Sequence, residues 1–205
     1  MKALLLSGGI DSAALAYWKR PEILFTIDYG QAVAQAEINS ARQIAQATGI
    51  NHEVLTVRTV PVLGTGSLAK KPSLNFASSP EWWPYRNQWL ITIAAMRGIS
   101  IGVDDILVGS VASDKIHRDG TLVFYEHISG LLTCQEGNIR VSAPAIDLPS
   151  EELIRESKIP LSILGWTFSC HISCDPCGAC RGCTKHLDVF EYAESLYAGS
   201  QSGGD

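Results

Sequence analysis

Short apolar runs alternate with longer segments of helical spacing along much of the chain. The runs stop at glycines or polar residues, which is typical of buried parallel strands. They read KALLLS at 2–7, EILFTIDYG at 22–30, HEVLTV at 52–57 and DDILVGS at 104–110. The segments between them predict helices at 11–20, 32–49 and 87–100. The pattern therefore predicts strands and helices in alternation.

Two of the predicted helices carry boundary signals. Asp11 and Ser12 open the first helical segment and are candidate N-cap residues. The second segment keeps its apolar residues on one face and is followed by Gly49, a typical helix stop.

The order of these elements predicts the fold class. Alternating strands and helices favour an α/β fold with an open, mostly parallel, doubly wound sheet of the Rossmann-like kind. We expect residues 1–160 to form this domain, residues 161–198 a small cysteine-bearing segment with a C-terminal helix, and residues 199–205 a flexible tail. Ligands of such sheets bind beyond the carboxyl ends of the strands.

Composition narrows the class of protein. A chain of 205 residues with 46% hydrophobic content can bury one substantial core. A net charge of −5 gives no general attraction to nucleic acid. We find no signal peptide and no apolar run long enough to span a membrane, so we expect a cytoplasmic protein without a membrane or nucleic-acid partner.

The sequence SGGIDS at residues 7–12 lies between the first strand and the first helix. Gly8 and Gly9 let the backbone approach a ligand, and Ser7 and Ser12 add hydroxyl donors beside the helix N-terminus. This arrangement favours a phosphate site, although an ordinary tight turn is the alternative reading. It matches neither the Walker pattern nor the dinucleotide fingerprint.

A second group of candidate functional residues consists of cysteines. Four of them offer the thiolates that tetrahedral Zn²⁺ prefers, at Cys170, Cys177, Cys180 and Cys183. Iron–sulfur ligation is a weaker alternative, and thioredoxin-like chemistry is weaker still. Cys174 is either a bystander or an alternative ligand, and we expect Cys134 to be a small packing residue.

The SGGIDS loop resembles the pyrophosphate loop of the ATP pyrophosphatases, a superfamily with an adenine nucleotide alpha hydrolase type of fold. These enzymes cleave ATP between its α and β phosphates and adenylate an oxygen of their substrate. The resemblance implies that Ser7, Gly8, Gly9, Ile10 and Ser12 hold pyrophosphate and that Asp11 helps to place Mg²⁺ or water.

Further motifs extend this resemblance over residues 3–190. They are IDYGQ at 27–31, WPYRN at 83–87, DDILVGS at 104–110, APAIDL at 143–148, and WTFSC at 166–170 followed by CGACRGC at 177–183. In this order they resemble the QueC family of 7-cyano-7-deazaguanine synthases. The resemblance implies a homodimeric ligase that adenylates 7-carboxy-7-deazaguanine with ATP and amidates it with ammonia. A second ATP-dependent step would dehydrate the amide to a nitrile. It also implies Zn²⁺ on the four cysteines.

Other residues at the predicted sheet edge are candidates for nucleotide or substrate binding. Arg86 and Asn87, expected just ahead of a helix, suit a phosphate or carboxylate, with a solvated surface pair as the alternative. The ring of Tyr29 could stack on a base and the Gln31 amide could read its edge. Gly30 also belongs to the predicted site. We expect Asp114 to contact metal or substrate, and Lys185 and His186 to face phosphate. Their alternatives are a strand-ending turn, a solvated aspartate and an exposed helix.

Departures from the family fall on the substrate side. Ala32 and Val33 replace a common Arg-His pair. The segment 113–128 lacks the cysteine and arginine of the family's substrate loop, and Asp119 is a candidate counterpart of that loop's aspartate.

The segment 61–85 is long for a connector and could be a lid or a partner surface. Trp82 and Trp83 in this segment are alternatively core anchors.

These departures leave other functions open. One is a QueC-like ligase that joins the activated deazaguanine to an amine of a protein partner, as in bacterial antiphage defence. A non-catalytic binding protein is disfavoured by the intact SGGIDS loop. A tRNA-modifying pyrophosphatase is disfavoured because no appended basic domain is evident.

Overall fold

The computed structural model describes residues 1–57 and 63–201. Residues 61 and 62 of the predicted lid lie outside this part, and so do residues 202–205 of the predicted tail. The last helix continues to Gln201, so it covers the start of the segment that we expected to be a tail. The boundary expected near residue 199 therefore falls within this helix.

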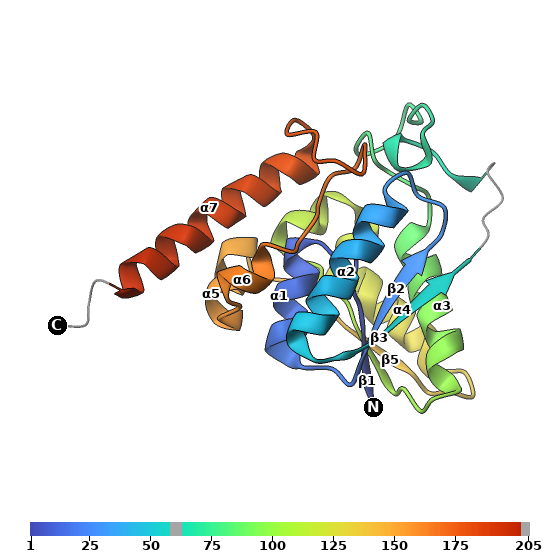
Figure 1. The fold of residues 1–205 in the computed structure, drawn as a ribbon. Coiled ribbons are helices and arrows are strands. Elements are labelled where there is room, and N and C mark those ends of the chain that lie inside the picture. The colour runs from blue at the N-terminus through green and yellow to red at the C-terminus, as the bar shows by residue number, and fades with distance from the viewer. Residues whose placement is uncertain (58–62, 202–205) are drawn as a thin grey trace.

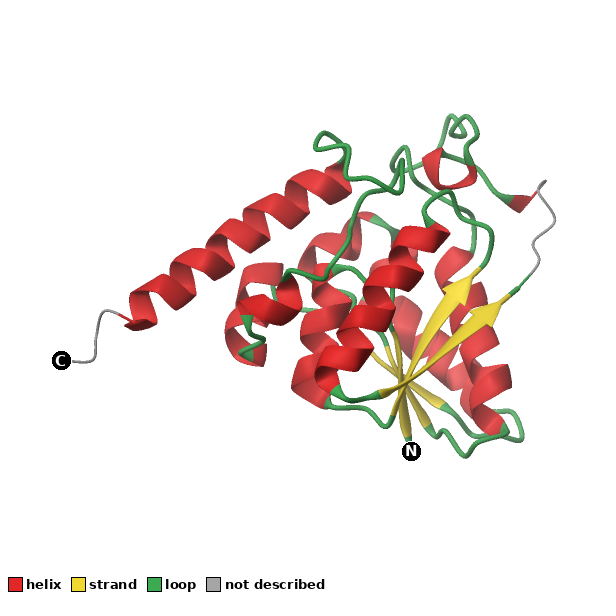
Figure 2. Cartoon of the chain, viewed as in Figure 1, coloured by secondary structure: helices red, strands yellow, loops and turns green. Residues whose placement is uncertain are grey.

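A five-stranded parallel sheet forms the centre of the molecule (Figures 1 and 2). The strands are β1 (Lys2–Leu5), β2 (Ile23–Asp28), β3 (Asn51–Thr56), β4 (Asp105–Leu107) and β5 (Arg140–Ser142). Their order is β3-β2-β1-β4-β5, and each neighbouring pair is parallel. The chain progresses outward from β1 in one direction and then returns to its other side at β4. This reversal creates a switch point between β1 and β4, where α/β proteins bind ligands.

Helices cover both faces of the sheet (Figure 2). Strand residues alternate between the two cores, because side chains of a strand point to opposite faces. Leu4, Leu6 and Leu24 pack in the core with α1, α2 and the C-terminal helices. Ala3, Phe25 and Ile106 pack in the core with α3 and α4. The bounds are α1 (Ile10–Lys19), α2 (Ala34–Thr48), α3 (Arg86–Ile99), α4 (Leu122–Thr133), α5 (Ser150–Ser157), α6 (Leu161–Leu164) and α7 (Arg181–Gln201).

The expected α/β fold is confirmed, and the predicted strands and helices form close to their expected bounds. The predicted caps of α1 are wrong. Gly9 is the N-cap and makes no side-chain cap bond, because the helix already begins at Ile10 and places Asp11 and Ser12 inside its first turn. Gly49 ends α2 in the left-handed conformation, as expected.

The C-terminal helix α7 runs along one flank and its end projects from the body of the molecule (Figure 1). It packs against α5 and α6, and Tyr197 Oη donates a hydrogen bond to the Ile159 carbonyl at 2.8 Å. Its N-terminal turn lies at the carboxyl edge of the sheet beside the SGGIDS loop, since Lys185 reaches Asp11. Among the described residues, none of the helices has the length and apolar character needed to cross a bilayer.

Candidate active site at the carboxyl edge of the sheet

A cavity of about 340 Å³ opens where β1, β2 and β4 end. It lies at the switch point of the sheet, so the site is where the fold rule places it. Most of the sequence-predicted residues line it, namely Ser7, Gly9, Ile10, Asp11, Ser12, Tyr29, Arg86, Asn87, Asp114, Lys185 and His186. Gly8, Gly30 and Gln31 do not line this cavity as the described part of the chain forms it.

The SGGIDS loop gathers its hydroxyl groups at the start of α1. The Oγ atoms of Ser7 and Ser12 lie 3.1 Å apart, and Ser12 Oγ donates to the Gly9 carbonyl at 2.9 Å. The Gly9 N–H donates to Ser7 Oγ at 3.3 Å. These groups surround a helix N-terminus, where N–H groups and the helix dipole favour an anion. The loop thus has the chemistry of a phosphate site.

Gly8 is the tightest point of the loop. Its φ is +81°, and an added Cβ would lie 2.7 Å from the Glu37 carbonyl oxygen and 2.9 Å from Ser40 Cβ. The Gly8 carbonyl accepts hydrogen bonds from Ser40 Oγ at 2.8 Å and from the Phe168 N–H at 2.9 Å. Gly8 therefore does not face the cavity. It anchors the loop to α2 and to the segment before the cysteines.

Asp11 and Lys185 form an ion pair at the base of the cavity. Lys185 Nζ lies 2.8 Å from Asp11 Oδ2 and 3.8 Å from Asp114 Oδ1, so it connects α7 to the first helix. Burial raises the pKa of Asp11, and the charge of Lys185 opposes this effect. Asp11 Oδ1 is buried without a hydrogen-bond partner among the described residues. Two carboxylates with an unpaired oxygen fit a hard divalent cation such as Mg²⁺.

Arg86 lines the cavity together with Tyr29 and Glu37, and the charges of these groups act on one another. Arg86 and Asn87 are the first two residues of α3 and do not lie ahead of the helix as expected, because Tyr85 adopts the left-handed conformation and serves as the N-cap. Arg86 Nε donates to Asn87 Oδ1 at 3.4 Å, and Asn87 Nδ2 donates to the Asp119 carbonyl at 3.0 Å. The guanidinium therefore faces the cavity as a charged, partly buried group.

Tyr29 lines the cavity, but its ring packs edge-to-face on Trp83 and Trp89 at centroid distances of 5.2 and 6.0 Å. The Gln31 amide is used within the protein. It accepts from the Tyr29 N–H at 3.0 Å and donates to Glu37 Oε2 at 2.6 Å. A role for Gln31 in reading a base directly is therefore not supported by its position; it holds the strand end and Glu37 in place.

Several cavity residues were missed from the sequence. Glu37 lies on α2, and Glu81, His117, His171 and Arg181 come from loops and from the start of α7. Burial raises the pKa of Glu37 to about 7, although Gln31 and Arg86 act against this shift. No local motif distinguishes these residues, since the loops that carry them meet only in the folded chain.

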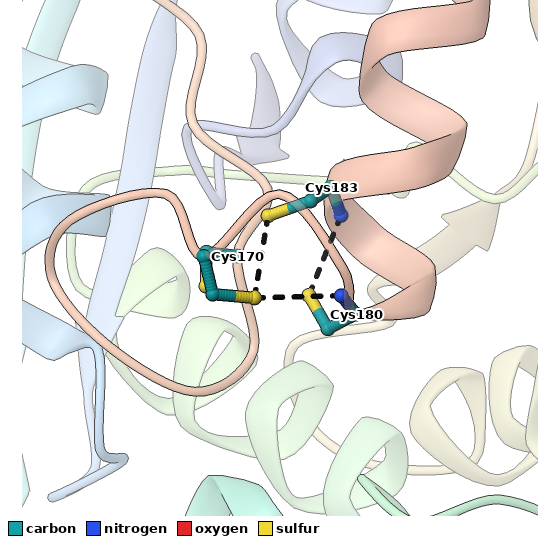
Figure 3. Close-up of side chains that lie close together, drawn as sticks. Cys170, Cys180 and Cys183 are labelled. Carbon is teal, nitrogen blue, oxygen red and sulfur yellow. Dashed lines mark hydrogen bonds between the residues drawn. The ribbon is translucent and has the colours of Figure 1, made fainter.

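The predicted metal ligands come together. The sulfur atoms of Cys170, Cys177, Cys180 and Cys183 all lie within 4.8 Å of one another. Figure 3 shows Cys170, Cys180 and Cys183 converging between a loop and the first turn of α7. Backbone N–H groups of Cys180 and Cys183 donate to the preceding sulfurs at 3.4 Å, which stabilises thiolates. Four soft ligands at this separation fit a tetrahedral metal ion.

The remaining cysteines lie apart from this cluster. Cys174 is exposed and is not a member of the four-sulfur group. Cys134 is also exposed, at the C-cap of α4, so its expected role as a packing residue is wrong. The helix ends there and turns the side chain outward.

Comparison with known proteins shows a match between residues 2–194 and the family model described as "Queuosine biosynthesis protein QueC". The chain belongs to the QueC family. It is similar to the 7-cyano-7-deazaguanine synthase of Methanobrevibacter smithii, with 29% identity over 93% of this chain and 92% of the relative. The 7-cyano-7-deazaguanine synthase of Chlorobium chlorochromatii is 30% identical over 94% of this chain and 92% of the relative. The resemblance expected from the motifs is thus confirmed.

For this QueC family member, the two sequence-predicted clusters are parts of one structure. Phe168 and Ser169 precede Cys170 and contact the SGGIDS loop, and Lys185 follows Cys183 by two residues. The four cysteines therefore lie next to the start of α7, which carries Lys185 beside Asp11.

Proposed function

We propose that this QueC family protein is an ATP-dependent carbon–nitrogen ligase that adenylates 7-carboxy-7-deazaguanine and amidates it. The observation that carries this proposal is the arrangement of the SGGIDS loop, the Asp11–Lys185 pair and Arg86 around one cavity. The names of the relatives supply the substrate class. Conversion of the amide to the nitrile is the further step that these names imply.

The residues suggest how the first bond is made. Ser7, the Gly9 N–H and Ser12 would bind the departing pyrophosphate, with Lys185 neutralising charge. Asp11 and Asp114 would hold Mg²⁺, which would neutralise phosphate charge and orient the triphosphate. Arg86 faces the same space and would hold the substrate carboxylate or the α-phosphate. A carboxylate oxygen attacks the α-phosphorus, and the bond to pyrophosphate breaks.

The second bond uses the activated acyl group. The nitrogen of ammonia attacks the acyl carbon, the bond to the AMP oxygen breaks with its electron pair, and the nitrogen loses a proton. AMP and the amide are the products. A charged carboxylate repels such a nucleophile, so adenylation by ATP removes the main barrier. The protein's contribution is positioning and charge neutralisation.

The cysteine cluster would hold Zn²⁺ as a structural ion. Its four thiolates leave no open position of the kind that catalytic zinc sites keep. Its task would be to fix the segment that ends at Lys185. We also propose a homodimer in the cytoplasm, as the resemblance implied.

A second acceptor is suggested by the surface beside the cavity. The segment that contributes Leu68 and Glu81 to the cavity also exposes Phe76 by 78% and Tyr85 by 79%. Exposed aromatic residues are typical of interaction surfaces. A protein amine presented there, for example in antiphage defence, could replace ammonia as the nucleophile.

Mass spectrometry of the reaction products tests the proposal. The protein is incubated with ATP, Mg²⁺ and 7-carboxy-7-deazaguanine, with ammonium in one sample and a candidate protein partner in another. We expect AMP, pyrophosphate and the amide or nitrile with ammonium. A deazaguanine mass on the partner alone would select the second acceptor. Absence of AMP from both samples would contradict the proposed function.

A further inference from the structure

Four polar residues from outside the SGGIDS loop line the cavity. Glu81 comes from the segment before α3, His117 from the loop before α4, His171 from the cysteine segment and Arg181 from the start of α7. Burial lowers the pKa of His117, Asp119 and Glu81 act against this shift, and Arg86 and Arg181 add to it. Arg181 Nη1 lies 3.7 Å from Glu81 Oε1, and His171 Nε2 lies beside Gly182, the residue after Arg181. The cluster presents one carboxylate among hydrogen-bond donors.

Glu81 is held firmly in this position. Ser67 N–H donates to the Pro80 carbonyl at 2.9 Å, and Thr65 Oγ1 donates to the Trp82 carbonyl at 2.9 Å, so both neighbours of Glu81 are fixed. Ser78 Oγ also lies 2.7 Å from His117 Nδ1. The segment is therefore tied to the cavity wall on both sides of Glu81, and its carboxylate is not a freely moving surface group.

Within residues 1–57 and 63–201, the Glu81 carboxylate is largely buried and its ion pair is long. The residue is 8% exposed, and Arg181 Nη1 lies 3.7 Å from Oε1, which is longer than a direct hydrogen bond. The Glu81 side chain keeps 10% exposure at the cavity wall, so a bound ligand would displace the remaining water and would have to supply donors in its place. A ligand with paired N–H donors would supply them. Arg181 Nη2 donates to the Ser113 carbonyl at 3.3 Å, and its Nη1 lies beside Glu81, where it could donate to an adjacent acceptor.

This alternation of acceptor and donor matches the edge of a guanine-type base. That edge carries a ring N–H and an exocyclic amino group as donors, next to a carbonyl oxygen as acceptor. We propose that Glu81 accepts from the ring N–H and the amino group of the deazaguanine, while Arg181 donates to its carbonyl oxygen. This assignment rests on the proposed function and names the residues that select its substrate.

Glu37, the other glutamate on the cavity wall, is less suited to this role. Gln31 already donates to its Oε2 at 2.6 Å, and the charge of Arg86 also acts on it. Glu81 instead lies beside donors from three different segments. The substrate loop of the family is altered in this chain, so recognition by Glu81 would supply contacts from another part of the fold.

A comparison of two ligands tests this assignment. The dissociation constants of 7-carboxy-7-deazaguanine and of its analogue without the exocyclic amino group are measured by calorimetry in the presence of the non-cleavable α,β-methylene-ATP. For the unaltered protein we expect the analogue to bind about 10- to 100-fold more weakly, as for the loss of a bond to a charged group. In Glu81→Gln this ratio should fall to a few-fold.

The matched control is Glu152→Gln, which removes an exposed glutamate paired with Arg155 at 2.6 Å and should retain the full ratio. If Glu81→Gln weakens both ligands equally, Glu81 only holds the segment in place and the assignment is wrong. An unchanged ratio in Glu81→Gln, or equal binding of the two ligands to the unaltered protein, would also overturn it. The calorimetry measures binding without turnover. If the unaltered protein binds the two ligands with the expected ratio but releases no AMP with ATP, the proposed reaction is wrong and the Glu81 assignment still holds.

Discussion

Asp11 combines burial with a charge partner, which makes it the most informative single residue of the site. Lys185 holds one of its oxygens at 2.8 Å, and the other is buried and unpaired among the described residues. Because burial raises its pKa and Lys185 counteracts this, the carboxylate depends on neighbouring cations to remain charged. A divalent ion bound with ATP would be such a cation.

Replacing Asp11 by Asn should therefore impair chemistry more than folding. The amide keeps the size of the side chain but loses its charge, so the divalent ion and Lys185 lose their common partner. We expect AMP release to fall by at least about 100-fold, with an unchanged far-ultraviolet circular dichroism spectrum. Near-normal AMP release from a folded Asp11→Asn protein would show that this carboxylate is not needed.

Glu37 predicts a pH dependence of stability. Burial raises its pKa from 4.5 to about 7 in the folded chain. A carboxyl group with a raised folded pKa contributes most stability at low pH, and this contribution is lost as the pH rises through about 7. In Glu37→Gln the free energy of unfolding should change less between about pH 5 and about pH 8 than in the unaltered protein. Urea unfolding at each pH measures this difference.

An exposed glutamate provides the control for this pH effect. Glu152→Gln should leave the pH dependence of unfolding unchanged, because Glu152 lies at the surface in an exposed ion pair. The same pH slope in Glu37→Gln and the unaltered protein would mean that Glu37 ionises as freely when folded as when unfolded.

At the scale of elements, the loop between β1 and α1 depends on how closely α2 approaches it. Gly8→Ala places a Cβ 2.7 Å from the Glu37 carbonyl oxygen in a left-handed conformation. Gly49→Ala has a similar φ of +70° but no atom within 4 Å of the added carbon. We expect about 1 kcal/mol of destabilisation for Gly49→Ala and a clearly larger loss for Gly8→Ala, measured by urea unfolding.

Only Gly8→Ala should also reduce AMP release, since α2 would displace the loop. Equal destabilisation of the two variants would show that the backbone conformation, and not the contact with α2, sets the need for glycine at position 8.

The cysteine segment should act as a metal-dependent support for the start of α7. We expect about one Zn²⁺ per chain by elemental analysis. Chelation or Cys180→Ser should lower the melting temperature and reduce AMP release, because Lys185 loses its fixed position. Cys174→Ser is the matched control, since Cys174 is exposed and outside the four-sulfur group. A fully active protein without metal would contradict this account.

At the scale of the whole molecule, the sequence predicted the features that depend on short local patterns. The strand runs, the SGGIDS loop and the spaced cysteines each have a physical reason that is visible within a few residues, and each has its expected place in the fold. The predicted N-cap of α1 is wrong because the helix begins at Ile10, ahead of the predicted caps. Local sequence preferences define the ends of helices poorly. The sequence predicts that the Gln31 amide faces a bound base. It cannot show the hydrogen bond from Gln31 to Glu37, because this bond depends on how α2 packs.

Residues that meet only through the tertiary fold could not be predicted. Glu81 and Arg181 are separated by the whole α3–α6 region and come together because the segment before α3 and the start of α7 reach the same edge of the sheet. The sequence alone shows two unremarkable charged residues. The substrate side of the cavity is therefore the part of the site that needed the structure.

The most direct test of the account is exchange of labelled pyrophosphate into ATP. This exchange requires that the protein transfers AMP to the substrate reversibly, and it needs no acceptor amine. We predict exchange that depends on both Mg²⁺ and 7-carboxy-7-deazaguanine and that is lost in Asp11→Asn. Absence of exchange, together with AMP release that does not require the deazaguanine, would contradict carboxylate adenylation as the reaction of this site.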